Sequence, residues 1–283
     1  MSGVVPVIEV LDLEPAASDF LAEAIAGLSA SPRTLPSKFF YDERGSDLFL
    51  EICELPEYYV TRTETDILAR YASEMADSIG ANAELVGFGT GAGIKTRLLL
   101  EHLENPIAYV PVDISKQRLI ESAEALQITM PELEILPVCA DYLQPLRLPT
   151  PARKPEHIAV FFPGSTIGNL QPAQAKDFLR RICRLSGHSG GLIIGVDLEK
   201  PVELLEAAYN DRAGVTAMFN LNMLTRANRE LGADFDLAAW QHRAVYNREL
   251  HRIEMHLVAR AAQQVHLGGR TFDFASGEKI ITE

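Results

Sequence analysis

A glycine-rich turn is the first segment of the sequence whose residue types and spacing fit a ligand site. Gly89-Thr90-Gly91-Ala92-Gly93 separates an apolar stretch from a stretch with helical spacing. Glycines let a backbone approach a ligand closely, and the N–H groups at the start of the following helix point toward that ligand. A plain tight turn is the alternative, but between a strand and a helix the pattern favours a site for a nucleotide or a nucleoside cofactor.

The glycine spacing distinguishes two kinds of cofactor. The dinucleotide fingerprint, G-x-G-x-x-G, requires a glycine where this chain has Ile94. The chain instead has G-x-G-x-G, the form usual for S-adenosylmethionine. We therefore predict an S-adenosylmethionine site, and we keep an NAD-dependent oxidoreductase as the alternative from a different class of enzyme.

Acidic residues follow the next two predicted strands. Asp113 lies 24 residues after Gly89, where a carboxylate accepts the hydroxyls of a ribose, with a helix cap as the alternative. Asp141-Tyr142 follows the third strand, where the acid can accept from an adenine amino group while the ring packs on the base. A simple loop is the alternative there. Ligand-type residues after three consecutive strands predict one cofactor pocket.

The segment Phe161–Leu170 (FFPGSTIGNL) is an apolar strand that ends in a Gly/Ser turn and presents Asn169. An amide oxygen can hold an amine without protonating it, and methyl transfer requires that the amine keep its lone pair free. We therefore expect the acceptor substrate near Asn169. A turn or cap role is the alternative for this residue.

The elements that must position these residues alternate between strand and helix from about residue 63. Thr61-Arg62-Thr63-Glu64 resembles a capping box and predicts that a helix begins there. Five strands are expected at 83–89, 108–114, 133–140, 157–162 and 191–196, with helices at 94–104, 115–128 and 172–185. This alternation predicts an α/β fold with a mostly parallel, Rossmann-like sheet covered on both faces.

The domain organisation follows from where that alternation stops. Residues 63–200 are expected to form the cofactor-binding domain. Residues 1–62 and 201–283 do not follow the rhythm, and strand-like stretches such as Arg252–Ala259 alternate there with glycine-containing turns. We expect these two segments to form a second lobe together.

Composition narrows the classes of partner. The 283 residues include 26 Lys and Arg against 39 Asp and Glu, a net charge of −13, which disfavours nucleic acid. There is neither a basic, apolar leader nor a membrane-length apolar run, so we expect a cytoplasmic protein. Cys53, Cys139 and Cys183 lie far apart, and the histidines lack an H-E-x-x-H spacing, so neither disulfides nor a metal centre are expected.

Four longer motifs resemble the histidine Nα-methyltransferases of ergothioneine biosynthesis, and the similarity covers nearly the whole chain. They are Lys38–Glu64, Phe161–Pro172, Ala208–Leu224 and Asn228–Asp236. The resemblance implies a class I methyltransferase fold with a second, substrate-binding lobe. It also implies an enzyme that transfers three methyl groups from S-adenosylmethionine to the α-nitrogen of L-histidine, giving hercynine.

The resemblance further implies roles for single residues, with core or surface packing as the alternative for each. Lys95, in the Lys-Thr-Arg position of the family, would bind the cofactor. The others would bind substrate: Tyr58 and Tyr209 its carboxylate, Asn169 and the Gly164 backbone its amine, and Glu283 its imidazole, while Tyr41 and Phe49 close the pocket. Asn169 and Tyr41 are the expected catalytic residues.

Two departures from the family pattern matter. Gly87 stands where relatives carry a glutamate, and the chain ends at Glu283 where relatives continue with a serine two residues later. From these departures we expect weak or absent histidine methylation by this chain, with cofactor binding less affected. The alternatives are a methyltransferase for another amine or amino acid and a catalytically impaired homologue. Oligomeric state does not follow from the sequence.

Overall fold

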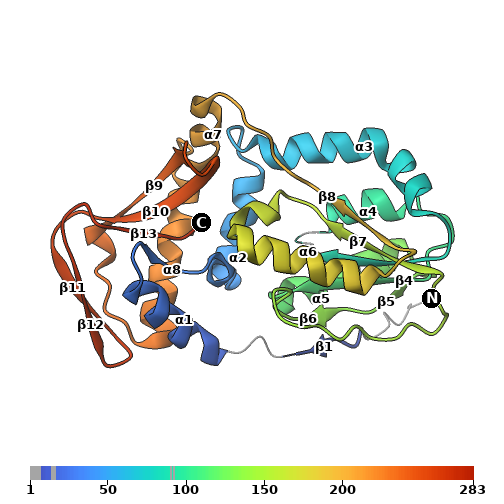
Figure 1. The fold of residues 1–283 in the computed structure, drawn as a ribbon, viewed down its shortest axis with the longest axis horizontal. Helices are drawn as coiled ribbons and strands as arrows, with labels where there is room; N and C mark the ends of the chain where they lie inside the picture. Colours follow the sequence, from blue (N-terminus) through green and yellow to red (C-terminus); the bar gives the residue numbers. More distant parts are fainter. Residues whose placement is uncertain (1–7, 14–16, 90, 92) are drawn as a thin grey trace. The chain divides into compact units, whose positions relative to one another are not determined.

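The structure is a computed structural model, and it describes residues 8–13, 17–89, 91 and 93–283 (Figure 1). The described chain divides into two compact units. The first comprises residues 8–13 and Val60–Asp197, and the second comprises residues 17–59 and Leu198–Glu283. The boundaries near 60 and 197 lie a few residues from those expected at 62 and 200. Residues 8–13, expected in the second lobe, instead belong to the first unit.

The first unit is built on a parallel sheet, as predicted. Its strand order is β1-β6-β4-β3-β7-β8, with β5 paired to β4, and every pairing is parallel. The strands are β1 (Leu11–Asp12), β3 (Ala83–Phe88), β4 (Ala108–Asp113), β5 (Glu134–Ile135), β6 (Val138–Cys139), β7 (His157–Phe162) and β8 (Gly191–Ile194). The central strand β3 is buried along its whole length, which explains its continuous apolar run.

Two details of this sheet differ from the sequence expectation. The single strand expected at 133–140 is divided into β5 and β6, because Pro137 has no N–H to donate to a strand ladder. Two-residue β1 was not predicted, since a pair of residues carries no periodicity. Leu11 pairs with Val138 at the edge of the sheet.

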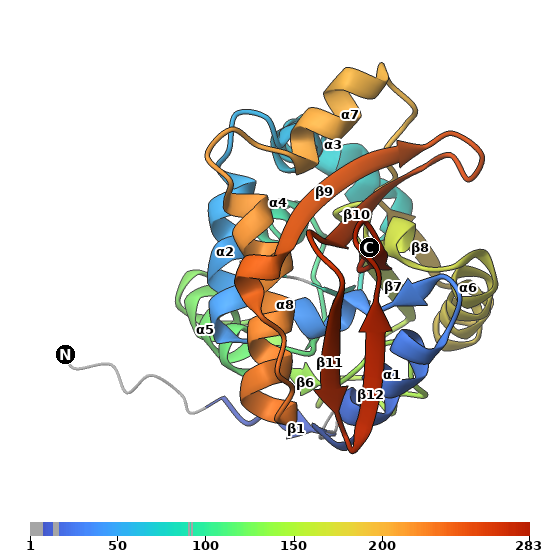
Figure 2. The same ribbon diagram turned by 90° about the vertical axis from the view of Figure 1, so that its left-hand side faces the viewer.

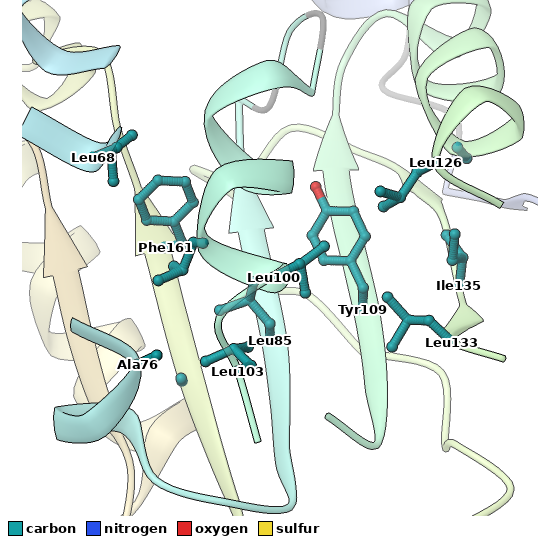
Figure 3. Packing of buried hydrophobic residues seen from close by; sticks show 13 residues of the cluster. Leu68, Ala76, Leu85, Leu100, Leu103, Tyr109, Leu126, Leu133, Ile135 and Phe161 are labelled. Atoms are coloured by element: carbon teal, nitrogen blue, oxygen red, sulfur yellow. The ribbon is translucent and has the colours of Figure 1, made fainter. Parts of the chain in front are cut away.

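Helices cover both faces of the sheet, and alternate strand residues point to each of them. The helices are α3 (Tyr59–Ile79), α4 (Ile94–Leu100), α5 (Lys116–Thr129) and α6 (Pro172–Ser186). On one face Leu85 and Tyr109 pack with Leu68 of α3, Leu100 of α4 and Leu126 of α5 (Figure 3).

On the opposite face Val86 and Val110 lie in a second cluster. Phe178 and Ile182 of α6, four residues apart and therefore on one side of the helix, belong to the same cluster. The two clusters enclose the sheet in apolar side chains and hold the carboxyl ends of its strands in a fixed arrangement.

The capping box expected at Thr61 is wrong. Helix α3 begins earlier, at Tyr59, so Thr61 lies inside its first turn. The carboxylate of Glu64, which a capping box would turn back toward Thr61, instead accepts hydrogen bonds from Gly164 and Lys95. A tertiary contact has replaced the local one.

The second unit combines a four-stranded sheet with helices from both ends of the chain (Figure 2). The sheet order is β2-β13-β10-β9, and β11 and β12 form a separate hairpin. Its strands are β2 (Arg33–Thr34), β9 (Trp240–Asn247), β10 (Arg252–Ala259), β11 (Gln263–Leu267), β12 (Arg270–Phe274) and β13 (Lys279–Ile281). Its helices are α1 (Ala17–Ser29), α2 (Glu43–Cys53), α7 (Val202–Tyr209) and α8 (Val215–Leu231), with short 3-10 helices at Ser37–Phe40 and Leu237–Ala239.

Strand β13 lies between β2 and β10, and this position fixes the residues that follow it. The Thr282 N–H donates to the Met255 carbonyl at 2.9 Å, and the Met255 N–H donates to the Glu283 carbonyl at 3.0 Å. Helix α8 packs against β9 and β10 on the same sheet. Within the described residues, no helix is both long enough and apolar enough to cross a membrane.

Candidate active site

The carboxyl ends of the parallel strands bring the predicted cofactor residues of the first unit to one edge. Gly89 follows β3, Asp113 ends β4, and Asp141 follows β6 by two residues. The Gly89 N–H donates to the Val112 carbonyl at 3.0 Å, and the Ala140 N–H donates to the Asp113 carbonyl at 3.0 Å. Ligands of open α/β sheets bind at this edge.

The glycine turn has the backbone shape that its sequence requires. Gly89, Gly91 and Gly93 have φ angles of 61°, 52° and 73°, in the left-handed region that favours glycine. A Cβ placed on Gly89 or Gly91 would meet no atom within 4 Å, so both face open space. Thr90 and Ala92 lie outside the described residues. The turn therefore leaves room beside the start of α4 for a ligand.

Asp113 faces this glycine turn. Its carboxylate accepts a hydrogen bond from the Ser115 N–H at 2.9 Å and further ones from the backbone of Gly91 and Ile114. Burial raises the pKa of Asp113 above its usual value, while these N–H donors favour the ionised form. The contact with Gly91 links the acid to the turn, as a shared cofactor pocket would require.

Asp141 and Tyr142 lie just after β6, at the same carboxyl edge of the sheet. One Asp141 oxygen accepts from the Leu143 N–H at 2.8 Å, forming a local turn. The Tyr142 ring packs on Phe162 and Phe178, with centroids 5.6 Å away in each case, and on Phe88 at 5.9 Å. The aromatic ring is thus anchored in the core beside the sheet edge.

Glu64 is a residue of this edge that sequence reasoning did not single out. Its carboxylate lies 2.5 Å from the Lys95 ammonium, and both of its oxygens lie 2.8 Å from the Gly164 nitrogen. A Cβ on Gly195 would lie 1.9 Å from the same carboxylate, so a larger residue there would displace the Glu64 carboxylate from this position. The signal available in the sequence was the position of Glu64 as the last residue of the motif Lys38–Glu64.

The turn after β7 presents Asn169. Gly164 and Ser165 both have positive φ, 86° and 57°, and the Ser165 hydroxyl accepts from the Asp197 N–H at 3.0 Å. A 3-10 helix, Thr166–Asn169, follows. The Asn169 side chain is half-buried, and its amide makes no hydrogen bond to another of the described residues. The amide is therefore available to a ligand.

An aromatic cluster in the second unit brings together four of the residues that the resemblance assigned to substrate. Tyr58 and Tyr209 pack edge to face with ring centroids 5.7 Å apart. Phe49 lies 6.4 Å from Tyr58 and 5.7 Å from Tyr41. Phe219 of α8, which sequence reasoning did not single out, packs on Tyr41 at 5.9 Å and on Phe49 at 6.0 Å.

Glu283 reaches the same cluster from the end of β13. Burial raises the pKa of Tyr58 well above its usual value, and the neighbouring Tyr209 and Glu283 raise it further. Although Glu283 keeps some exposed surface, protein surrounds its carboxyl group, and this burial raises the pKa of Glu283 to about 7. An acid and two phenols thus share one apolar surrounding.

Other chemistries find less support among the described residues. These residues contain no group of three or more His, Cys, Asp or Glu side chains arranged to hold a metal ion. None of the three cysteines, all of which are described, forms a disulfide. Burial raises the pKa of the Cys139 thiol to about 12, which keeps it protonated and unreactive.

The parallel sheet, the open glycine turn and the acid facing it define an α/β protein with a nucleoside-cofactor site at the carboxyl edge. A family model described as histidine-specific, S-adenosylmethionine-dependent methyltransferase matches residues 20–283. The chain belongs to this family, and its cofactor is S-adenosylmethionine.

The chain is similar in sequence to histidine N-alpha-methyltransferases and to a protein of ergothioneine biosynthesis. A histidine N-alpha-methyltransferase of Mycolicibacterium smegmatis is 43% identical over 94% of this chain and 85% of that protein. One of Mycobacterium tuberculosis is 41% identical over 92% of this chain and 82% of that protein. Ergothioneine biosynthesis protein 1 of Neurospora crassa is 34% identical over 71% of this chain and 23% of that protein.

Proposed function

We propose that this chain methylates the α-nitrogen of L-histidine three times, giving hercynine. This proposal replaces the weak or absent methylation expected from Gly87 and from the end of the chain, because β13 and the hydrogen bond from the Met255 N–H to the Glu283 carbonyl hold Glu283 in place. The observation that carries the proposal is the placement of Glu283 beside Tyr58 and Tyr209 in the second unit. Together these side chains offer two phenol hydroxyls for a carboxylate and one carboxylate for an imidazole N–H. The family and the two mycobacterial relatives support the same substrate.

The first unit fits S-adenosylmethionine. The open backbone at Gly89 and Gly91 leaves space for it, Asp113 would accept the ribose hydroxyls, and Asp141 would accept from the adenine amino group. Tyr142 would pack on the adenine. Lys95 would use the N–H groups that Glu64 leaves free to hold the cofactor's carboxylate. When bound, the cofactor supplies a methyl group on a sulfonium, which is an already activated electrophile.

The substrate residues of the second unit account for a preference for histidine. The buried carboxylate of Glu283 would accept an imidazole N–H, and a substrate side chain without such a donor would leave it unpaired. The mismatch costs roughly 1–3 kcal/mol, or more for a charged group. Tyr41 and Phe49 would complete the apolar surrounding, which excludes the water that could otherwise pair with the Glu283 carboxylate. The second unit is accordingly the proposed substrate lobe.

Methyl transfer requires the protein to align the substrate amine with the methyl group of the sulfonium, and it requires no nucleophilic side chain. The amine lone pair forms the new N–C bond as the S–C bond breaks, and the bonding electrons leave with sulfur. The nitrogen must lose a proton before each of the three transfers, because the ammonium ion and its mono- and dimethylated forms have no free lone pair. The Asn169 amide oxygen and the Gly164 backbone would orient the amine without protonating it.

Incubation with S-adenosylmethionine and each of the twenty amino acids, read by mass spectrometry, tests the proposal. We expect histidine alone to gain one, two and then three methyl groups. Tyr58→Phe and Glu283→Gln should slow this reaction more than Tyr71→Phe, which changes an exposed tyrosine of α3. Faster methylation of another amino acid would replace the proposed substrate.

A further inference from the structure

A chain of hydrogen bonds joins the residue before Glu283 to the backbone of Tyr209. The Thr282 hydroxyl donates to the Asn220 amide oxygen at 2.8 Å, and the Asn220 amide nitrogen lies 2.9 Å from His242 Nδ1. His242 Nε2 lies 2.7 Å from the Tyr209 carbonyl oxygen. This hydrogen-bond network lies entirely within the second unit. It runs from the residue after β13 through α8 and β9 to the end of α7.

A single assignment of donors and acceptors satisfies every hydrogen bond in this network. A carbonyl oxygen can only accept, so His242 carries its proton on Nε2 and Nδ1 presents a lone pair. Burial lowers the pKa of His242, which favours this neutral ring. The Asn220 NH₂ group donates to Nδ1 and also to the His256 carbonyl at 3.2 Å, which leaves its oxygen to accept from Thr282. The single hydroxyl hydrogen of Thr282 is shared between this oxygen at 2.8 Å and the Met255 carbonyl oxygen at 3.0 Å.

Burial gives the chain its rigidity. Asn220 is fully buried, and Thr282 is 2% exposed. Buried amides without partners are costly, so each member holds its neighbour in place. At the far end, Asn210 donates to the Ala244 carbonyl at 3.0 Å and accepts from the Ala244 N–H at 2.9 Å, which ties the chain segment after Tyr209 to β9.

We propose that Asn220, His242 and Thr282 are positioning residues that fix the separation of Tyr209 and Glu283. This inference rests on the proposed function, in which Tyr209 holds the substrate carboxylate and Glu283 holds the imidazole. The two groups of histidine are separated by a fixed number of bonds, so a shift of either residue would spoil one end of the fit. The network thus sets the length of side chain that the lobe accepts.

The sharpest test uses Thr282→Val, which keeps the shape of the side chain but removes the hydroxyl that donates to Asn220. We expect the KM for L-histidine to rise about tenfold, which corresponds to one lost buried hydrogen bond, with a smaller fall in kcat. Thr282→Ser keeps the hydroxyl and should restore most of the affinity. Thr225→Val is the control, since Thr225 is exposed and its hydroxyl donates to the Leu221 carbonyl of the same helix.

A second variant acts at the other end of the chain. His242→Leu removes both the donor and the acceptor, whereas His242→Gln offers an N–H and an oxygen in their place. We expect His242→Leu to raise the KM for histidine as Thr282→Val does, with partial rescue by His242→Gln. Calorimetric binding of S-adenosylmethionine should stay unchanged in every variant, which shows that the first unit is intact. A cooperative thermal unfolding transition and a wild-type circular dichroism spectrum should show that the second unit, which carries the network, still folds.

Glu283→Gln and Tyr209→Phe, measured alongside, distinguish the inference from the function beneath it. If they raise the KM for histidine while Thr282→Val and His242→Leu do not, the positioning role is wrong and the proposed function stands. If neither Glu283→Gln nor Tyr209→Phe changes that KM, the substrate assignment fails and the inference fails with it. If kcat falls, the KM for histidine rises and cofactor binding weakens by similar factors in these variants, the network has only a structural role.

Discussion

Tyr58 and Tyr209 pack edge to face, 5.7 Å between ring centroids, although one precedes and the other follows nearly the whole cofactor-binding unit in the sequence. Both belong to the second unit, which is therefore assembled from the two ends of the described chain. A pair of phenols from such distant segments marks the place where the proposed substrate carboxylate binds.

Removing one phenol hydroxyl should weaken substrate binding. We expect Tyr58→Phe and Tyr209→Phe each to raise the KM for L-histidine by roughly 10–100-fold, the scale of a lost hydrogen bond to a charged group. The rings remain, so the packing with Phe49 is kept. Steady-state kinetics measure the effect, with Tyr71→Phe as the control. Unchanged KM values in both variants would remove the carboxylate from this position.

Asp113 should matter for the cofactor and not for the fold alone. Asp113→Ala is expected to weaken S-adenosylmethionine binding by roughly 1–3 kcal/mol, because it removes a charged acceptor for the ribose hydroxyls. Isothermal calorimetry measures the affinity. Asp177→Ala, on the exposed face of α6, should leave it unchanged. Equal affinities for the Asp113 variant and the wild type would contradict the ribose assignment.

The ion pair between Glu64 and Lys95 should be coupled more strongly than a surface pair. A double-mutant cycle with Glu64→Gln and Lys95→Met is expected to give a coupling free energy of about 1 kcal/mol or more in urea unfolding. The comparison pair is Arg97 and Glu101, which lie four residues apart at the end of α4, and both of these side chains are about half exposed. Their cycle should give less than about 0.5 kcal/mol. Similar values for the two cycles would show that Glu64 is an ordinary surface partner.

Glu283 should make stability depend on pH with a definite sign. Its pKa in the folded chain is about 7, above the ordinary glutamate value of 4.5, so the folded state resists losing this proton. The stability associated with the neutral carboxyl is complete below about pH 4.5 and is lost as the pH rises toward 7. Glu283→Gln cannot ionise, so its melting temperature should gain on that of the wild type across this range. A difference that does not vary with pH would show that Glu283 is not buried in this way.

Local patterns predicted the parts of the fold that depend on local sequence. The continuous apolar run of β3 and the glycine turn before α4 were recognisable because burial on both faces and positive φ angles restrict residue type directly. Pro137 interrupts the third strand, and a plain hydrophobicity pattern overlooked it.

The missed parts are contacts between distant segments. Glu64 and Gly164 are 100 residues apart in sequence, and a capping-box pattern offered a nearer use for the carboxylate. The network from Thr282 to Tyr209 also joins four separate elements, and no periodicity records it. The grouping of Tyr58, Tyr209 and Glu283 was expected only from the resemblance, since nothing local marks these residues as neighbours.

The position of the new methyl groups tests the central claim most directly. L-histidine is incubated with S-adenosylmethionine that carries an isotopic label in its methyl group, and the product is examined by NMR. We predict one labelled signal from three equivalent methyl groups on the α-nitrogen, correlated with the histidine α-proton. Label on an imidazole nitrogen, or no labelled histidine from a chain that binds the cofactor, would contradict the account.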